Sequence, residues 1–442
     1  MKTRFLAALA LVASSSPVAT LAEDPAAGPP AAAAPTPAPT ASTPAPAASP
    51  DGRPATQAEV KSLAEEVRRL KLEMGVPGVV EFGSYTGMGA GASKVYQTSK
   101  GLSIGGYGEL VYSNDVTHHQ AYTEVLRLVL YVGYRFNEKI IFNSEIEFEH
   151  GAKEIGIEFA YFDFLFMDEL KLRIGNVLVP VGFLNENHEP IFFYGVFRPS
   201  VDRYLIPTTW SQMGLGLYGD LGPVRYKAYI LTGLDAFGEE PLKAATWIRN
   251  ARTGGILAKA NTFAGVLSLN ADVGPATFGG SFYGGQAGQG ARTATGQTIT
   301  APVCIGEVHA LVAWRGIQAR GIVAWGSLGD AGAISERLGL TGFQVIGSRT
   351  WGGYLEVGYN VLTLVDTSMS LTPFVRFEAL NLQAAVPEGG LQDPALSQRI
   401  VTAGLDFKPI PQVVVKADWQ QTSSQVPGVT LQQVDVGLGF VF

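Results

Sequence analysis

From residue 102 onward, apolar and polar side chains alternate with a period of two, in stretches of about ten residues. The stretch 139–150 shows the two faces clearly. Its apolar positions are Ile140, Phe142, Ile146 and Phe148, and its polar positions are Lys139, Asn143, Glu145, Glu147 and Glu149. A β-strand with this pattern has one face in an apolar medium and the other in water. About ten residues is also the length of a tilted strand that crosses a membrane.

The stretch 125–136 repeats the pattern, with Arg127 and Arg135 on the face opposite to Leu126, Leu128 and the alternating apolar residues that follow. A charge at the centre of a bilayer costs about 2 to 4 kcal/mol, so we expect the two arginines to face an aqueous lumen. After the leader, no stretch approaches the roughly 18 consecutive apolar residues of a membrane-spanning helix. We therefore predict an all-β protein, a transmembrane antiparallel β-barrel of about 16 strands over residues 101–442.

The first hundred residues have a different composition and predict four segments. Residues 1–22 have the basic start, short apolar stretch and small-residue end of a cleaved signal peptide. Residues 23–54 are rich in Ala and Pro and predict a disordered tether. Residues 55–76 repeat apolar residues at heptad spacing and predict a short coiled-coil helix, or else a single amphipathic helix packed on its own barrel. Residues 77–100 are expected to be a linker.

Connections between the predicted strands alternate between tight turns and long loops. Because short turns lie on the periplasmic side of such barrels, the long loops should be extracellular or folded into the pore. The third loop, 185–210, is the natural candidate to fold inward and form a constriction. An even strand number places both termini in the periplasm. The alternating C-terminal strand ends at Phe442, which resembles the signal read by the barrel-assembly machinery.

Composition argues against several classes of function. The formal net charge of −7 makes nucleic acid an unlikely partner, and the single Cys304 cannot form an internal disulfide. Five scattered histidines offer no nucleophile with a neighbouring base, and His118 with His119 lacks the further ligands of a metal site. We predict no enzymatic activity, no catalytic residue, no cofactor and no metal.

Strand parity and the third loop supply the candidate pore-lining and constriction residues. They are Arg127, Arg135, Lys171, Arg173, Arg198, Arg203, Arg225, Lys227, Arg376, Glu109, Glu145 and Glu147. Parity also places Arg315, Lys408, Lys416 and further acidic residues on this face, so that the two signs nearly cancel and predict weak selectivity. Arg198 and Arg203 could attract anions, or could pair with Asp202 or Glu189 and only fix the loop.

Several segments resemble the family of phosphate-selective porins O and P and broader outer-membrane porins. They include Gly105-Gly106-Tyr107-Gly108-Glu109, Val179-Pro180-Val181-Gly182-Phe183, Pro207-Thr208-Thr209-Trp210, Trp351 to Tyr359, Pro373 to Glu378 and Gly404 to Pro409. The resemblance implies trimeric barrels of sixteen strands in the outer membrane of a Gram-negative bacterium, some with periplasmic coiled coils. It does not by itself imply selectivity for phosphate.

Three functional hypotheses follow. The first is a porin, a passive water-filled channel for small hydrophilic solutes or for inorganic and organic ions, constricted by loop 185–210. The second is an anion channel selective for phosphate or polyphosphate, and the third is a structural outer-membrane barrel with little conductance. The expected partners are outer-membrane lipid, two further copies in a homotrimer and the assembly machinery, with the N-terminal segment in the periplasm.

Overall fold

The computed structural model describes residues 61–62, 65–66 and 83–442. The predicted signal peptide and tether, and most of the predicted coiled coil, lie outside the described residues. Residues 61–62 and 65–66 are helical. Within the described part of the chain, no helix is long and apolar enough to cross a membrane.

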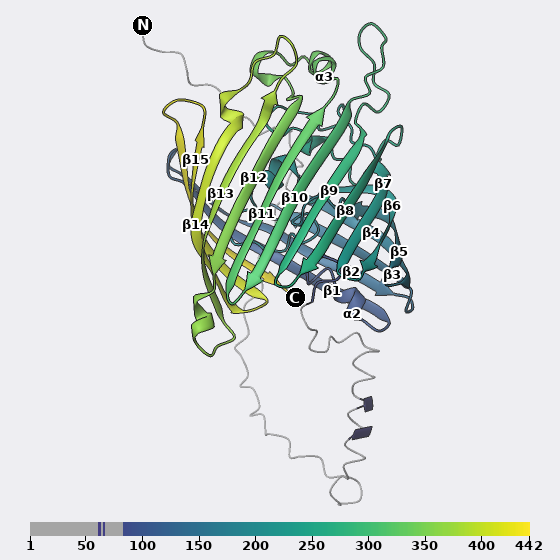
Figure 1. Cartoon of the computed structure of the whole chain (residues 1–442), viewed down its shortest axis with the longest axis vertical. Coiled ribbons are helices and arrows are strands. Elements are labelled where there is room, and N and C mark those ends of the chain that lie inside the picture. Colours follow the sequence, from purple (N-terminus) through teal and green to yellow (C-terminus); the bar gives the residue numbers. More distant parts are fainter. Residues whose placement is uncertain (1–60, 63–64, 67–82) are drawn as a thin grey trace, which may run out of the picture. The chain divides into compact units, whose positions relative to one another are not determined.

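The described residues form a closed barrel of sixteen antiparallel strands, in which each strand pairs with its neighbours in sequence and β1 closes on β16 (Figure 1). The strands are β1 (Gly101–Asp115), β2 (Gln120–Arg135), β3 (Ile140–Glu149), β4 (Glu154–Met167), β5 (Leu170–Leu178), β6 (Ser211–Leu221), β7 (Val224–Thr232), β8 (Phe263–Val273), β9 (Ala276–Gln286), β10 (Pro302–Trp314), β11 (Ile317–Leu328), β12 (Arg349–Tyr359), β13 (Ser370–Ala385), β14 (Ser397–Ile410), β15 (Val413–Ser424) and β16 (Thr430–Val441). The predicted barrel is confirmed.

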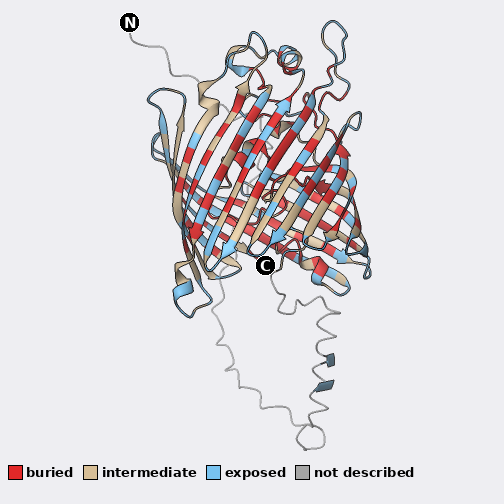
Figure 2. Ribbon diagram, viewed as in Figure 1, coloured by how far each residue is buried: buried red, intermediate tan, exposed pale blue. Residues whose placement is uncertain are grey.

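Burial alternates along the strands, as the period-two pattern predicts (Figure 2). In β12, Tyr354 and Glu356 are buried on the inner face, whereas Trp351 and Leu355 are exposed on the outer face. The other strands likewise expose large apolar side chains outward, for example Leu217, Phe282 and Phe377. An apolar outer face of this kind suits a lipid environment.

Leu126 departs from the predicted alternation. The register between β1 and β2 shifts by one residue at Glu109 and Leu110, which leaves Leu126 without a partner on β1. This β-bulge turns Leu126 inward, where it is 8% exposed and packs beside Val111 and Val196. The prediction that Leu126 faces lipid is therefore wrong, because period two holds only while the pairing is regular.

The connections define two rims, which we call the turn end and the loop end. The turn end carries two-residue connections such as 168–169 and 222–223, together with 360–369, which contains η4 (Val361–Leu364). The loop end carries 179–210, 233–262, 287–301 and 329–348, which contain η1 (Val201–Leu205), η2 (Arg249–Ala251), α3 (Ala331–Arg337) and η3 (Gly342–Gln344). It also carries 386–396, which contains η5 (Pro394–Leu396). Arg315, expected in the lumen, instead lies in the turn 315–316 and stacks over Trp314.

Two further segments occupy the lumen. The chain enters β1 through residues 83–98, which include α2 (Lys94–Gln97), and it leaves β5 into the loop 179–210. Both segments contribute to one buried apolar cluster, through Met88 and Val95 from the first and Val181 and Leu205 from the second. The core of this barrel therefore lies inside its wall.

Candidate functional site in the barrel lumen

The loop 179–210, which contains the predicted constriction 185–210, folds into the barrel. It has four prolines, Pro180, Pro190, Pro199 and Pro207, which interrupt any regular strand or helix. Its apolar residues Val181, Phe193 and Ile206 are at most 2% exposed. A loop with this composition gains stability by packing inward, provided that the wall satisfies its backbone polar groups.

Charged side chains of the wall bind the backbone of this loop. Lys416 on β15 donates through Nζ to the carbonyls of Phe193 at 2.6 Å and Gly195 at 3.0 Å. Two residues along the same strand, Asp418 accepts the backbone N–H of Val196 at 2.6 Å. A cation and an anion on one strand thus bind the C=O and the N–H of the same peptide group, between Gly195 and Val196.

A second set of anchors comes from β12 and β13. Glu378 accepts the backbone N–H of Ser200 at 2.7 Å and also that of Val201, at the start of η1. Arg376 bridges Glu378 at 2.9 Å and Glu356 at 3.1 Å. These three wall side chains are at most 1% exposed, so the loop is held by a fully desolvated network.

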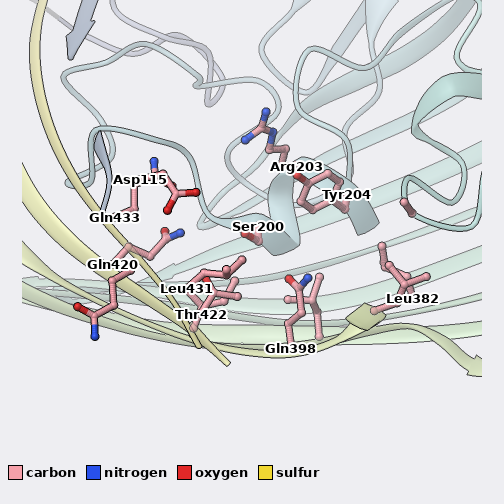
Figure 3. Close-up of a pocket in the computed structure, with 15 residues that line it drawn as sticks. Asp115, Ser200, Arg203, Tyr204, Leu382, Gln398, Gln420, Thr422, Leu431 and Gln433 are labelled. Atoms are coloured by element: carbon pink, nitrogen blue, oxygen red, sulfur yellow. The ribbon is translucent and has the colours of Figure 1, made fainter. Parts of the chain in front are cut away.

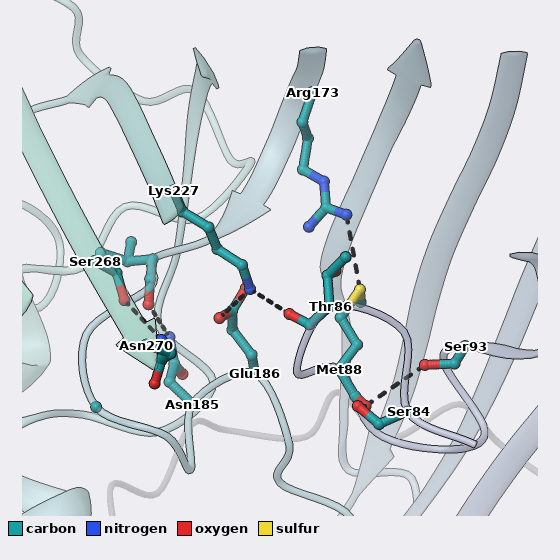
Figure 4. A network of polar contacts seen from close by, with 12 residues as sticks. Ser84, Thr86, Met88, Ser93, Arg173, Asn185, Glu186, Lys227, Ser268 and Asn270 are labelled. Carbon is teal, nitrogen blue, oxygen red and sulfur yellow. Dashed lines mark hydrogen bonds and ion pairs between the residues drawn. The ribbon is translucent and has the colours of Figure 1, made fainter. Parts of the chain in front are cut away.

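The residues 83–98 lie against the same loop from the turn end (Figure 4). Glu189 on the loop accepts the backbone N–H groups of Gly91 at 2.8 Å and Ala92 at 3.2 Å. Lys227 on β7 donates to the Thr86 carbonyl at 2.7 Å and to both carboxylate oxygens of Glu186 at 2.6 Å.

The side chains of this segment also reach the wall. Tyr96 donates to Asp163 at 2.5 Å, and Arg173 pairs with the same carboxylate at 2.8 Å. Residues 83–98 were predicted to belong to a linker. They fold inward because Met88, Val95 and Tyr96 are apolar or aromatic and the small residues among them allow close approach. A Cβ at Gly89 would overlap the Glu189 carboxylate.

The structure separates the predicted site residues into three groups. Arg127, Lys171, Arg173, Lys227, Arg376, Glu109, Glu145 and Glu147 lie on the inner wall, each in an ion pair. Arg135 and Arg225 lie at the turn end, where Arg135 donates to the carbonyls of Tyr96 and Thr98 and Arg225 pairs with Asp272. On the loop, Arg198 donates to the His188 carbonyl at 2.9 Å and lies 4.0 Å from Glu109, whereas Arg203 is exposed.

Sequence reasoning missed several interior residues. Asp163 lies in the aromatic stretch 159–166, where both strand faces look apolar and parity gives no signal. Arg320 pairs with Glu356 at 3.3 Å and donates to the carbonyl of Phe192. Arg252 comes from the loop 233–262, whose inward path depends on contacts with Thr208 and Thr209.

Two cavities open at the loop end. The first, of about 320 Å³, lies between η1 and the wall, with Ser200, Arg203 and Tyr204 opposite Gln398 and the neighbouring strands (Figure 3). The second, of about 390 Å³, lies beside β4 and is lined by Glu158, Arg249 and Arg252. Both cavities are lined by charged and apolar side chains.

Burial changes the acidity of groups in the loops. It raises the pKa of Asp202 to about 8 and that of Glu189 to about 7. Burial also lowers the pKa of Arg249 to about 9, with the nearby cations Arg252 and Arg203 acting in the same direction. No hydrogen bond of normal geometry reaches either carboxylate oxygen of Asp202 among the described residues, although the nearby Tyr354 hydroxyl favours the charged form.

Comparison with known proteins gives one sequence relative and several structural ones. No family model matches the chain. The fold is similar to that of Salmonella typhi OmpF in complex with daunomycin (TM-score 0.53, 10% identity, 78% of this chain and 98% of that chain). It is also similar to the loop L8 deletion mutant of OmpT, an outer membrane protein of Vibrio cholerae (TM-score 0.50, 11% identity, 78% and 100%). These likenesses show an outer-membrane porin fold.

The sequence relative is a protein of Aquifex aeolicus (strain VF5), described only as uncharacterized. It is 36% identical over 371 residues, which cover 80% of this chain and 82% of the relative. The match is long enough to include most of the barrel. This chain belongs to the same family as the Aquifex aeolicus protein.

Proposed function

We propose that the protein is an outer-membrane channel through which small hydrophilic solutes and ions pass passively, down their own gradients. The apolar outer face of the strands supports a position in outer-membrane lipid. Sixteen strands enclose a lumen wide enough for an aqueous path. The proposal involves no catalytic step.

The observation that carries this proposal is the anchored inward loop. Residues 179–210 are bound through their backbone by Lys416, Asp418 and Glu378 of the wall. A loop held in this way narrows the lumen. The narrowest point of a channel dominates the barrier to a permeating solute. Residues 83–98 narrow the turn end in addition.

Selectivity for phosphate or polyphosphate finds less support. Such a channel needs bases that are free to meet the anion. Among the described residues, the six buried bases are already engaged: Lys171, Arg173, Lys227, Arg320 and Arg376 pair with carboxylates, and Lys416 binds carbonyls. We therefore favour the general channel over a phosphate-selective channel.

A structural barrel with little conductance is the second candidate, and one observation favours it. Apolar residues from several loops pack inside the lumen, among them Trp210, Trp247 and Ile248, each fully buried. If these contacts leave no continuous aqueous path, the barrel would serve to hold the N-terminal segment at the membrane.

Single-channel recording in a planar bilayer tests these alternatives. We expect the purified protein to give discrete openings in KCl, and a variant lacking residues 83–98 to give larger ones because the turn end is then wider. Inhibition of the KCl current by added phosphate would instead support a phosphate channel. If neither protein conducts a current although both are folded, the channel proposal is wrong and the structural barrel is favoured.

Assembly and orientation form part of the same proposal. The heptad spacing within 55–76 supports a homotrimer with the N-terminal segment in the periplasm. Sedimentation of the detergent-solubilised protein should give the mass of three chains. A monomer that persists at high protein concentration would contradict the trimer.

A further inference from the structure

Acidic side chains gather on one sector of the inner wall, formed by β1, β3 and β4. Glu109, Glu145, Glu147 and Glu158 make up this group, which we call the acidic sector. The carboxyl groups of Glu147 and Glu158 lie close enough to interact directly. Two carboxylates that face each other are a common way of attracting a cation.

The acidic sector belongs to a wider imbalance of charge. Among the described residues, the buried class contains fourteen Asp and Glu side chains but only six Lys and Arg side chains. Most buried acids outside the sector are compensated, for example Glu378 by Arg376 and by two backbone N–H groups. Sequence parity suggested near balance, because it included bases at the turn end that are not buried, such as the half-buried Arg225 and the exposed Arg315.

Buried polar atoms in this sector lack partners. Glu109 Oε1, Glu145 Oε2 and Glu147 Oε1 have no hydrogen-bond partner among the described residues. The same is true of the hydroxyl of Tyr107, a fully buried side chain within electrostatic range of Glu145 and Glu147. Arg127 Nε and Nη1 and Arg198 Nε also have no hydrogen-bond partner among the described residues. Buried polar groups in proteins are normally satisfied, so these acceptors and donors together indicate a place for a polar occupant.

Three arginines face the acidic sector but do not neutralise it, and one of them, Arg252, is within electrostatic range of Glu158 and Glu147. Arg127 lies 3.8 Å from Glu109 and 3.7 Å from Glu147, and Arg198 lies 4.0 Å from Glu109. These separations are longer than hydrogen bonds, and Arg127 also lies 3.2 Å from Glu149, outside the sector. With four carboxyl groups and three guanidinium groups, the sector has more acidic than basic side chains.

The sector also has an approach from the loop end. Glu158 lines the second cavity, of about 390 Å³, and Glu147 lies next to Glu158. At the turn end, Glu145 contacts His188 at 3.1 Å, and Asn143, two residues before it, donates to the Ala92 carbonyl. Residues 83–98 therefore cover the turn end of the sector.

From this arrangement we infer that the acidic sector binds a small cation, such as K⁺ or Na⁺, and makes the channel prefer cations to anions. The inferred preference for cations rests on the proposed channel function, whereas the inferred binding of a cation does not. The three arginines act as internal counter-charges that weaken the preference. Cations would enter from the loop end past Glu158, through the cavity that Arg249 and Arg252 also line.

Reversal potentials in a KCl gradient test the selectivity. We expect K⁺ to be more permeant than Cl⁻, Glu147→Gln to lower the permeability ratio about threefold, and Arg127→Gln to raise it by a similar factor. Opposite shifts from neighbouring residues cannot arise from simple loosening of the fold. Glu388→Gln, on an exposed loop, is the control and should leave the ratio unchanged. Anion preference, or equal shifts from both variants, would overturn the inference.

Terbium luminescence tests binding without requiring conduction. Tb³⁺ bound in the sector should be sensitised by Tyr107, and excess Na⁺ should displace it. Glu147→Gln should weaken Tb³⁺ binding, and Arg127→Gln should strengthen it. The exposed group Glu149, His150 and Glu154 could also take up Tb³⁺, so all variants are compared in a Glu154→Gln background.

The two experiments separate the two proposals. If the protein does not conduct but binds Tb³⁺ in the sector, the cation site is supported and the channel proposal is wrong. If the protein conducts but shows neither cation preference nor sensitised Tb³⁺ luminescence, the channel is supported and the cation site is wrong.

Discussion

Individual buried charges in this barrel act mainly as anchors. Glu378 on the wall and Asp202 in the inward loop are both buried acids, but they differ in how far their charge is compensated. Glu378 on the wall has an arginine and two backbone N–H groups as partners, so its charge is compensated. Asp202, at the start of η1, is 1% exposed, and no hydrogen bond of normal geometry reaches either of its oxygens among the described residues. The nearby Tyr354 hydroxyl offsets only part of the effect of burial on the pKa of Asp202. The ionised form of Asp202 is therefore costly in the folded protein.

This difference predicts a pH dependence of stability. Burial raises the pKa of Asp202 to about 8, whereas the unfolded group titrates near 3.8. The folded state thus holds the proton more tightly, and the free energy of unfolding falls as pH rises from about 4 to 8. Asp202→Asn should remove this part of the fall, a gain of about 5 kcal/mol relative to wild type at pH 8.

Thermal unfolding in detergent at pH 5 and pH 8.5 provides the measurement. The wild type should lose more stability between these two values than Asp202→Asn does. Asp366→Asn, an exposed acid in the turn 360–369, should behave like the wild type. Equal losses in all three proteins would show that Asp202 does not titrate in this range.

Among the elements, the segment 83–98 depends most on distant partners. Its contact with Glu189 joins positions 98 residues apart, and its contact with Asp163 joins positions 67 apart. Gly89 lies where any side chain would collide with the Glu189 carboxylate. The segment therefore needs both a small residue at this point and an intact inward loop.

We expect Gly89→Val to release residues 83–98 from the lumen. Overpacking costs about 1–3 kcal/mol, which corresponds to roughly 5- to 150-fold more of the open form. The readout is maleimide labelling of Val95→Cys in a Cys304→Ala background, because Val95 is 2% exposed while the segment is docked. Gly265→Val, where a Cβ meets open space, should leave the labelling rate unchanged.

The same elements show what sequence reasoning could predict. The strands follow from local alternation, which is visible without knowing any partner, and β3 lies as predicted within the stretch 139–150. The bulge at Leu126 and the docking of residues 83–98 depend on pairing register and on contacts across the lumen. The inward loop was predicted, but the anchoring role of Lys416 and Asp418 was not, because parity shows which face a residue lies on and not what it binds.

At the scale of the whole molecule, the seam between β1 and β16 closes the barrel. The pairing runs from Tyr107 opposite Val441 to Asp115 opposite Gln433. Beyond the last strand residue, Phe442 exchanges two backbone hydrogen bonds with Gly106, at 3.0 and 2.9 Å. The terminal residue therefore belongs to the closure itself, in addition to its predicted role as an assembly signal.

Deleting Phe442 should separate these two roles. The seam loses two hydrogen bonds of about 0.5–1.5 kcal/mol each, a small part of a closure made by a full strand pair. Refolding from urea into detergent should therefore yield nearly as much heat-modifiable barrel as the wild type. If the assembly machinery reads Phe442, the folded protein recovered from outer membranes should fall much further. Equal losses in both settings would mean that Phe442 acts only through the seam, since detergent refolding involves no assembly factor.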